Sequence, residues 1–220
     1  MPNFFVTFAV VMETTILLVR HGETFDNARQ LMQGQTQGDL NERGREQAGQ
    51  VARRLAAEPL EAVVASDLRR AVQTADIIAA PHGLPVVTTP LLRERDWGSF
   101  TGRYIPDLKG VAWPDDIESE PALLARARSF LLYIAATYPG CRVVAVGHGI
   151  INKAILAVYA QSSMSEVQRM LNAEVRMLTL TPERAAALRA VATASLTSAG
   201  GDTTASVLAF ASGGMVASAE

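Results

Sequence analysis

Two histidines hold the positions in this chain that best suit chemistry. His21 lies between Arg20 and a glycine at the end of an apolar run, and His148 lies between two glycines at the end of another. A neutral imidazole can act as a nucleophile and carry a covalent intermediate. The neighbouring guanidinium of Arg20 disfavours the protonated imidazole, and a carbonyl that accepts from the other ring nitrogen would fix the tautomer of His21.

Arginines and a carboxylate follow further apolar runs. Arg69 and Arg70 come shortly after one such run, and Glu94 comes after another. The guanidinium fork matches the oxygens of a phosphate or a carboxylate, and a helix that begins at Gly149 would also attract an anion. Together, histidine, arginine and carboxylate suit the transfer of a phosphoryl group onto a histidine.

A metal centre is the rival chemistry for these residues. It would need several histidine, cysteine or carboxylate ligands at suitable spacing. The chain has three histidines and one cysteine, and arginines accompany the histidines that are best placed. Because these cations already supply the charge that a metal would bring, we expect neither a metal nor another cofactor.

Alternating strand and helix patterns predict the fold that positions these residues. Short apolar runs rich in branched residues indicate strands, and apolar stripes at helical spacing indicate helices. We expect strands at residues 14–19, 61–65, 84–89, 141–146 and 174–181, and helices at 41–58, from a Ser66 cap to 79, from Pro121 onward and at 149–160. This order is typical of an α/β fold with a mainly parallel central sheet covered by helices on both faces, a three-layer sandwich.

The polar residues that follow the strands should meet at one edge of this sheet. In open α/β sheets, ligands bind outside the carboxyl ends of the strands. Arg20 with His21, Arg70, Glu94 and His148 each follow a predicted strand. We therefore expect these side chains to line one site.

The chain is expected to form one domain over residues 14–197. Residues 1–13 form an N-terminal extension, in which Met12 is a candidate start, and no basic segment or cleavage site favours a signal peptide. Residues 198–220 form a low-complexity tail, which is a candidate contact in a homodimer.

Composition argues against several other classes of protein. A chain of 220 residues with 49% hydrophobic residues has enough apolar material for a packed core. The net charge of −2 comes without a block of lysine and arginine, which argues against a nucleic-acid partner, and no apolar run is long enough to span a membrane. Because Cys141 is the single cysteine, no internal disulfide can form, and we expect a cytoplasmic protein.

Four motifs, in this order, resemble those of the histidine phosphatase superfamily, which has the phosphoglycerate mutase-like fold. They are RHGET at 20–24 followed by Asn27, SDLRRAVQTA at 66–75, LRERDWG at 92–98 and GHG at 147–149. The resemblance extends from about residue 14 to about residue 180, and Glu118-Ser119 with Arg126 is similar to a supporting pattern of the family.

The resemblance implies a role for each matching residue. It makes His21 the nucleophile that becomes phosphohistidine and Glu94 the proton donor, in preference to Glu23 or Asp96. The residues that it implies for the phosphate site are Arg20, Asn27, Arg70 and His148.

The chain departs from the family pattern at two places. Gly147 stands where many members have a serine, and residues 38–44 lack the usual proline-leucine pair. Neither position belongs to the predicted chemical core.

The resemblance implies a metal-independent phosphomonoesterase acting on a small phosphorylated metabolite. A phosphoglycerate mutase-type transfer is one alternative, although family mutases carry a longer insertion between the positions of Glu94 and His148. A non-catalytic phospholigand-binding protein is the other, although both nucleophile and acid are present. We expect substrate specificity to reside after His21 and in residues 98–120, where Arg103 and Lys109 are candidates for binding a second acidic group.

Overall fold

A computed structural model describes residues 12–198 of the chain. Residues 1–11 of the predicted N-terminal extension and residues 199–220 of the predicted tail lie outside the described residues. The candidate start at Met12 and the candidate dimer contact in the tail are therefore not addressed by the fold.

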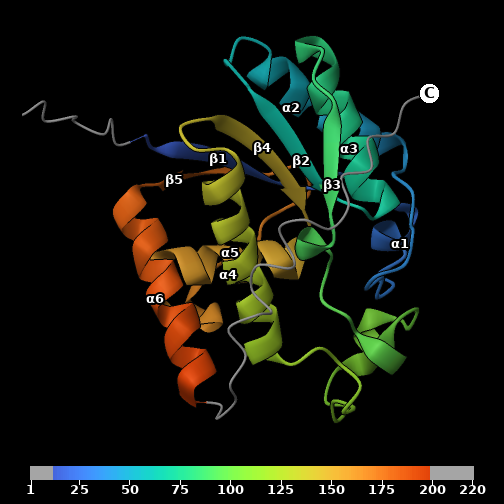
Figure 1. Cartoon of the computed structure of the whole chain (residues 1–220). Helices are drawn as coiled ribbons and strands as arrows, with labels where there is room; N and C mark the ends of the chain where they lie inside the picture. Colours follow the sequence, from blue (N-terminus) through green and yellow to red (C-terminus); the bar gives the residue numbers. More distant parts are fainter. Residues whose placement is uncertain (1–11, 199–220) are drawn as a thin grey trace, which may run out of the picture.

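The described residues form a five-stranded sheet with the strand order β3-β2-β4-β1-β5 (Figure 1). The strands are β1 (Thr14–Arg20), β2 (Ala62–Ser66), β3 (Val86–Thr89), β4 (Arg142–Gly147) and β5 (Val175–Leu180). Pairing is parallel from β3 through β2 and β4 to β1, whereas β5 runs antiparallel to β1. The predicted mainly parallel sheet is confirmed, and its four parallel strands end at one edge.

Helices cover both faces of the sheet (Figure 1). The α-helices are α1 (Phe25–Ala28), α2 (Glu42–Leu55), α3 (Arg69–Ala79), α4 (Glu120–Thr137), α5 (Gly149–Ala160) and α6 (Pro182–Ser198). On β1, Leu17 and Val19 pack with α2 and α3, whereas Ile16 and Leu18 pack with α4 and α5. Because both faces of β1 are buried, its sequence is a continuous apolar run.

The start of α3 differs from the prediction. Ser66 was expected to cap this helix, but it is the last residue of β2, and α3 begins at Arg69 after Leu68. The Ser66 hydroxyl accepts a hydrogen bond from the Leu68 backbone N–H at 3.3 Å. Ser66 therefore stabilises the turn between strand and helix, two residues before the N-cap.

Two helices were not expected. The short α1 lies between β1 and α2, where no helix was expected, and Thr24 caps it in a reciprocal pair with Asn27. The alanine-rich α6 follows β5 and packs against α4, with Leu188 in the core. Its sequence has little apolar periodicity, so no helical stripe indicated it. Among residues 12–198, no helix is long and apolar enough to cross a membrane.

Candidate active site

The turn after β1 places His21 beside the end of β4. The His21 backbone N–H donates to the Gly147 carbonyl at 3.0 Å, so His21 and His148 follow neighbouring strand ends. The turn also approaches the first turn of α2, where a Cβ on Gly22 would lie closer than 3.0 Å to the backbone of Gly44. Neither Gly22 nor Gly44 has room for a side chain, and together they let α2 pack directly on the turn that carries His21.

Opposite tautomers distinguish the two histidine rings. Nδ1 of His21 lies 2.6 Å from the Gly22 carbonyl oxygen, which can only accept, so this nitrogen carries the proton. Nδ1 of His148 lies 3.2 Å from Nε of Arg70, which can only donate, so the proton of His148 lies on Nε2. The ring centroids are 5.0 Å apart. His21 thus has a lone pair on Nε2, and His148 has an N–H donor on its own Nε2.

Burial keeps both imidazoles neutral. Desolvation lowers the pKa of His21 well below its ordinary value of 6.5, and the charges of Arg70 and Arg20 lower it further. Desolvation also lowers the pKa of His148 well below 6.5, with Arg70 and His21 as the next causes. The predicted effect of Arg20 on His21 is present, although burial is the larger cause.

Two buried guanidiniums lie beside these rings. Arg70 donates to the carbonyls of Gly34 and Thr36 at 2.8 and 2.6 Å, and burial lowers its pKa to about 10. Arg20 donates through Nη1 to the Met170 carbonyl at 2.8 Å, and burial lowers its pKa to about 10 as well. Nε of Arg20 and Nε2 of His148 are buried donors without a hydrogen-bond partner within residues 12–198. Two unsatisfied donors beside two cations favour an anion.

Glu94 lies at the start of α5. Its carboxylate accepts from the backbone N–H groups of Ile150 and Ile151, at 3.0 and 3.1 Å to Oε1. Glu94 also ranks among the charges that raise the pKa of Arg20 and of Arg70, which places it near both cations. The carboxylate therefore borders the candidate anion site.

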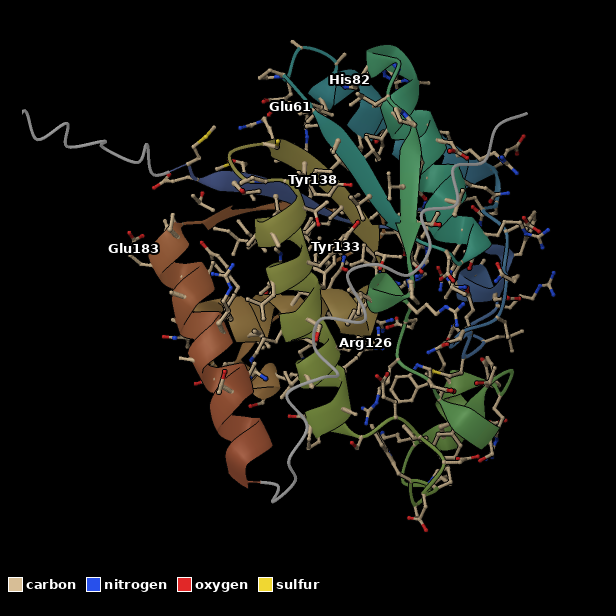
Figure 2. All side chains as sticks on the ribbon, viewed as in Figure 1. Glu61, His82, Arg126, Tyr133, Tyr138 and Glu183 are labelled. Atoms are coloured by element: carbon tan, nitrogen blue, oxygen red, sulfur yellow. The ribbon has the colours of Figure 1, made fainter. Side chains whose placement is uncertain are left out.

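Arg126 on α4 supports the segment that carries Glu94 (Figure 2). Its guanidinium donates to the carbonyls of Arg93 and Glu94 at 2.6 and 3.4 Å and forms an ion pair with Glu118 at 2.7 Å. The supporting pattern noted in the sequence therefore positions the predicted acid.

The competing carboxylates have local structural partners. Glu23 accepts from the Asn41 side chain at 2.8 Å and lies 3.6 Å from Arg43. Asp96 accepts from the Gly98 backbone N–H at 2.9 Å. The third histidine, His82, is half-buried in the turn that precedes β3, at the end of the sheet away from Arg126 (Figure 2).

A segment before β5 joins the site, although the sequence did not single it out. Asn172 donates to the His21 carbonyl at 3.0 Å and to Oδ1 of Asn27 at 3.3 Å. Met170 supplies the carbonyl that holds Arg20. Because β5 is antiparallel, the residues before it lie at the edge where the parallel strands end, so a search of residues after strands does not find them.

Gly147, which stands where many family members have a serine, lies against the side chain of Asn152 on α5. A Cβ at this position would lie closer than 3.0 Å to Oδ1 of Asn152. The Asn152 side chain is fully buried and donates to the Val19 carbonyl at 3.0 Å. Asn152 thus fills the space that a side chain at position 147 would occupy.

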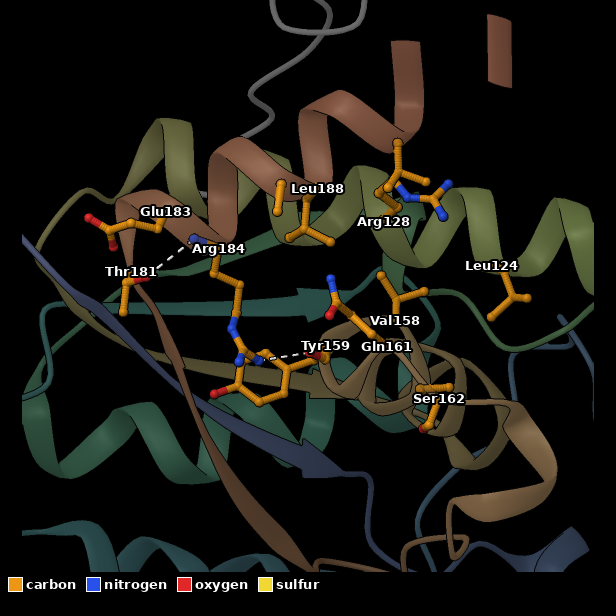
Figure 3. A pocket seen from close by; sticks show the side chains of 13 residues that line it. Leu124, Arg128, Val158, Tyr159, Gln161, Ser162, Thr181, Glu183, Arg184 and Leu188 are labelled. Atoms are coloured by element: carbon orange, nitrogen blue, oxygen red, sulfur yellow. Dashed lines mark hydrogen bonds between the residues drawn. The ribbon is translucent and has the colours of Figure 1, made fainter. Parts of the chain in front are cut away.

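A separate cavity of about 530 Å³ lies among α4, α5 and α6 (Figure 3). Arg184 spans part of it and donates to the Tyr159 carbonyl at 2.7 Å. None of the predicted site residues lines this cavity. Across residues 12–198, no group of three or more histidine, cysteine or acidic side chains is arranged to hold a metal ion.

Comparisons with known proteins show which family the chain resembles. A metal-independent phosphoserine phosphatase of Arabidopsis thaliana is 36% identical over 196 residues, covering 78% of each chain. A phosphoglycerate mutase-like protein 4 of the same plant is 36% identical over 182 residues, covering 75% of this chain and 79% of the relative. The solved structure of a mycobacterial glucosyl-3-phosphoglycerate phosphatase is 28% identical with a TM-score of 0.69, covering 76% of this chain and 90% of that one.

A family model described as histidine phosphatase superfamily (branch 1) matches residues 16–193. This match contains His21, Arg70, Glu94 and His148. The chain therefore belongs to branch 1 of the histidine phosphatase superfamily.

Proposed function

We propose that this phosphatase transfers the phosphoryl group of a small ester to Nε2 of His21 and then to water. The observation that carries the proposal is the pair of hydrogen bonds that sets opposite tautomers in the two histidines. His21 presents a lone pair for attack, and His148 presents a donor to a phosphoryl oxygen. Arg20 and Arg70 add two positive charges against the dianion. Asn27 accepts through its amide oxygen from Thr24 and Asn172, and its amide nitrogen, which forms no hydrogen bond within residues 12–198, can donate to the dianion.

The first half-reaction breaks the bond between phosphorus and the ester oxygen. Nε2 of His21 attacks phosphorus, and the leaving oxygen takes a proton from the protonated carboxyl of Glu94. The Gly22 carbonyl keeps accepting from Nδ1 and stabilises the phosphorylated ring. Little covalent chemistry is required of the other residues, whose contribution is positioning and charge stabilisation.

The second half-reaction breaks the bond between phosphorus and nitrogen. The Glu94 carboxylate takes a proton from water, the water oxygen attacks phosphorus, and inorganic phosphate leaves a neutral His21 with its lone pair restored. No metal is needed in this scheme because the guanidiniums supply the positive charge. A mutase would instead return the phosphoryl group to an organic acceptor.

The named relatives support a small phosphorylated metabolite as substrate, since phosphoserine and glucosyl-3-phosphoglycerate are both small phosphate esters. The test is release of inorganic phosphate from a panel of such esters and nitrophenyl phosphate, with and without EDTA. We expect turnover to persist in the chelator. No hydrolysis of any ester, inactivation by EDTA that a divalent metal reverses, or isomerisation of phosphoglycerate in place of phosphate release would overturn the proposal.

Location and assembly extend the proposal. We infer a cytoplasmic protein from its single cysteine and a homodimer from the composition of its tail. Size-exclusion chromatography with light scattering on the full chain tests the dimer, and a mass equal to one chain would contradict it.

A further inference from the structure

The segment from Val167 to Asn172 is fixed against the candidate active site at two points. Met170 accepts from Arg20, and Asn172 donates to the His21 carbonyl. The Ala173 backbone N–H also donates to the Arg20 carbonyl at 2.9 Å. Arg169 lies within this fixed segment, so its backbone is held beside the site.

The Arg169 guanidinium lies over Gly149, the residue after His148. A Cβ at position 149 would lie 2.5 Å from Nε of Arg169 and 2.7 Å from Nη2. The guanidinium therefore occupies the space above the first residue of α5. Its charge is among the lesser causes that lower the pKa of Arg20 and of His21, so it lies near both residues.

Arg169 is exposed. Within residues 12–198 its side chain forms no hydrogen bond and no ion pair with an acidic side chain. Arg20 and Arg70 already supply two buried positive charges at the site. A further guanidinium close to Arg20 is electrostatically unfavourable, and a second negative charge on the ligand would offset the repulsion.

We infer that Arg169 binds a carboxylate of the substrate, carried within a few bonds of the phosphate ester. The inference rests on the proposed phosphatase reaction. The phosphoryl dianion is matched by Arg20, Arg70 and the donor on His148, which leaves Arg169 available for one further negative charge. The planar fork of Arg169 fits a carboxylate bidentately.

The cations that the sequence suggested for a second acidic group are less well placed. The Arg103 guanidinium lies 5.3 Å from the centre of the Phe100 ring. Neither Arg103 nor Lys109 ranks among the charges that act on His21 or Arg20. Arg103 therefore serves as a matched control for Arg169.

The test compares esters that differ by a carboxylate. Phosphoserine is paired with phosphoethanolamine, and 3-phosphoglycerate with glycerol 3-phosphate. A hydrogen bond to a charged group is worth about tenfold in kcat/KM, so Arg169→Gln should lower kcat/KM about tenfold for phosphoserine and 3-phosphoglycerate. The kcat/KM for phosphoethanolamine, glycerol 3-phosphate and nitrophenyl phosphate should change by less than about twofold. Arg103→Gln should keep the wild-type preference for the ester with a carboxylate in each pair.

Three results would overturn the inference. An equal loss on both members of each pair would make Arg169 a phosphate ligand or a structural residue. No loss on either member would leave it without a role in binding, and loss of the preference in Arg103→Gln alone would assign the carboxylate to Arg103. Wild-type turnover of nitrophenyl phosphate separates these results from failure of the phosphatase reaction, since its absence overturns the proposed function itself.

Discussion

A single hydrogen bond sets the chemistry of each histidine at this site. His21 donates to a carbonyl and so keeps its lone pair on Nε2, whereas His148 accepts from Arg70 and so carries a proton there. Both rings are buried, and burial lowers the pKa of each well below 6.5, so both are neutral. Two residues of the same type, about 5 Å apart, can thus serve as nucleophile and as hydrogen-bond donor.

At the residue scale, the sharpest prediction concerns Glu94. An alkyl alcohol leaves poorly without a proton, and a positioned acid contributes about 10²–10⁴-fold. Glu94→Gln keeps an oxygen for the N–H groups of α5 but cannot protonate the leaving oxygen. In single-turnover measurements, cleavage of an alkyl phosphate should slow by at least about 100-fold, while the burst of nitrophenolate should slow much less. An equal effect on both would assign the acid to another group.

At the element scale, the ends of β1 and β4 and the start of α5 could be predicted from sequence, but the part of the site before the antiparallel strand β5 could not. The apolar runs of β1 and β4 placed His21 and His148 at one edge. Arg169 and Asn172 were missed because they precede β5, whose direction is set by pairing with β1 and not by any local pattern. The prediction that Ser66 caps α3 was wrong because β2 extends through Ser66.

The close contact between α2 and the turn that carries His21 predicts that one added methyl group on Gly44 strongly lowers stability. A Cβ on Gly44 would lie closer than 3.0 Å to the Glu23 backbone, which has no side-chain freedom to yield. Gly44→Ala should lower the free energy of unfolding by about 1–3 kcal/mol, and it should also lower phosphatase activity.

Gly49 provides the control for this prediction in the same helix. A Cβ there would meet only the end of the Arg53 side chain, at 3.5 Å. Gly49→Ala should therefore stabilise the protein by up to about 1 kcal/mol through helix propensity. Urea unfolding of both variants measures the difference, and equal stabilities would show that the Gly44 contact carries no constraint.

At the scale of the whole molecule, the two buried histidines make the free energy of unfolding depend on pH. Buried donors and cations are assembled in an apolar sandwich, and two imidazoles are kept neutral within it. The unfolded chain can protonate both histidines near their ordinary pKa of 6.5, whereas the folded chain cannot until the pH is much lower. Protons therefore favour the unfolded state below this pH.

This linkage predicts a loss of stability in mild acid. His21 and His148 should each lower the free energy of unfolding by up to about 1.4 kcal/mol per pH unit below pH 6.5, until the folded form is protonated. Urea unfolding between pH 6.5 and 5 should show this slope, and a variant with His21→Asn and His148→Asn should show a shallower one. An unchanged slope in that variant would mean that His21 and His148 take up protons in the folded chain at the same pH as in the unfolded chain.

The central claim is a covalent phosphate on His21, and trapping it is the most direct test. The chain is mixed briefly with a labelled phosphate ester, quenched in denaturant at alkaline pH and mapped by mass spectrometry. We expect an acid-labile, alkali-stable phosphate on the peptide that contains His21, and none in a folded His21→Ala variant. Phosphate on another residue, or labelling that persists in His21→Ala, would contradict the account.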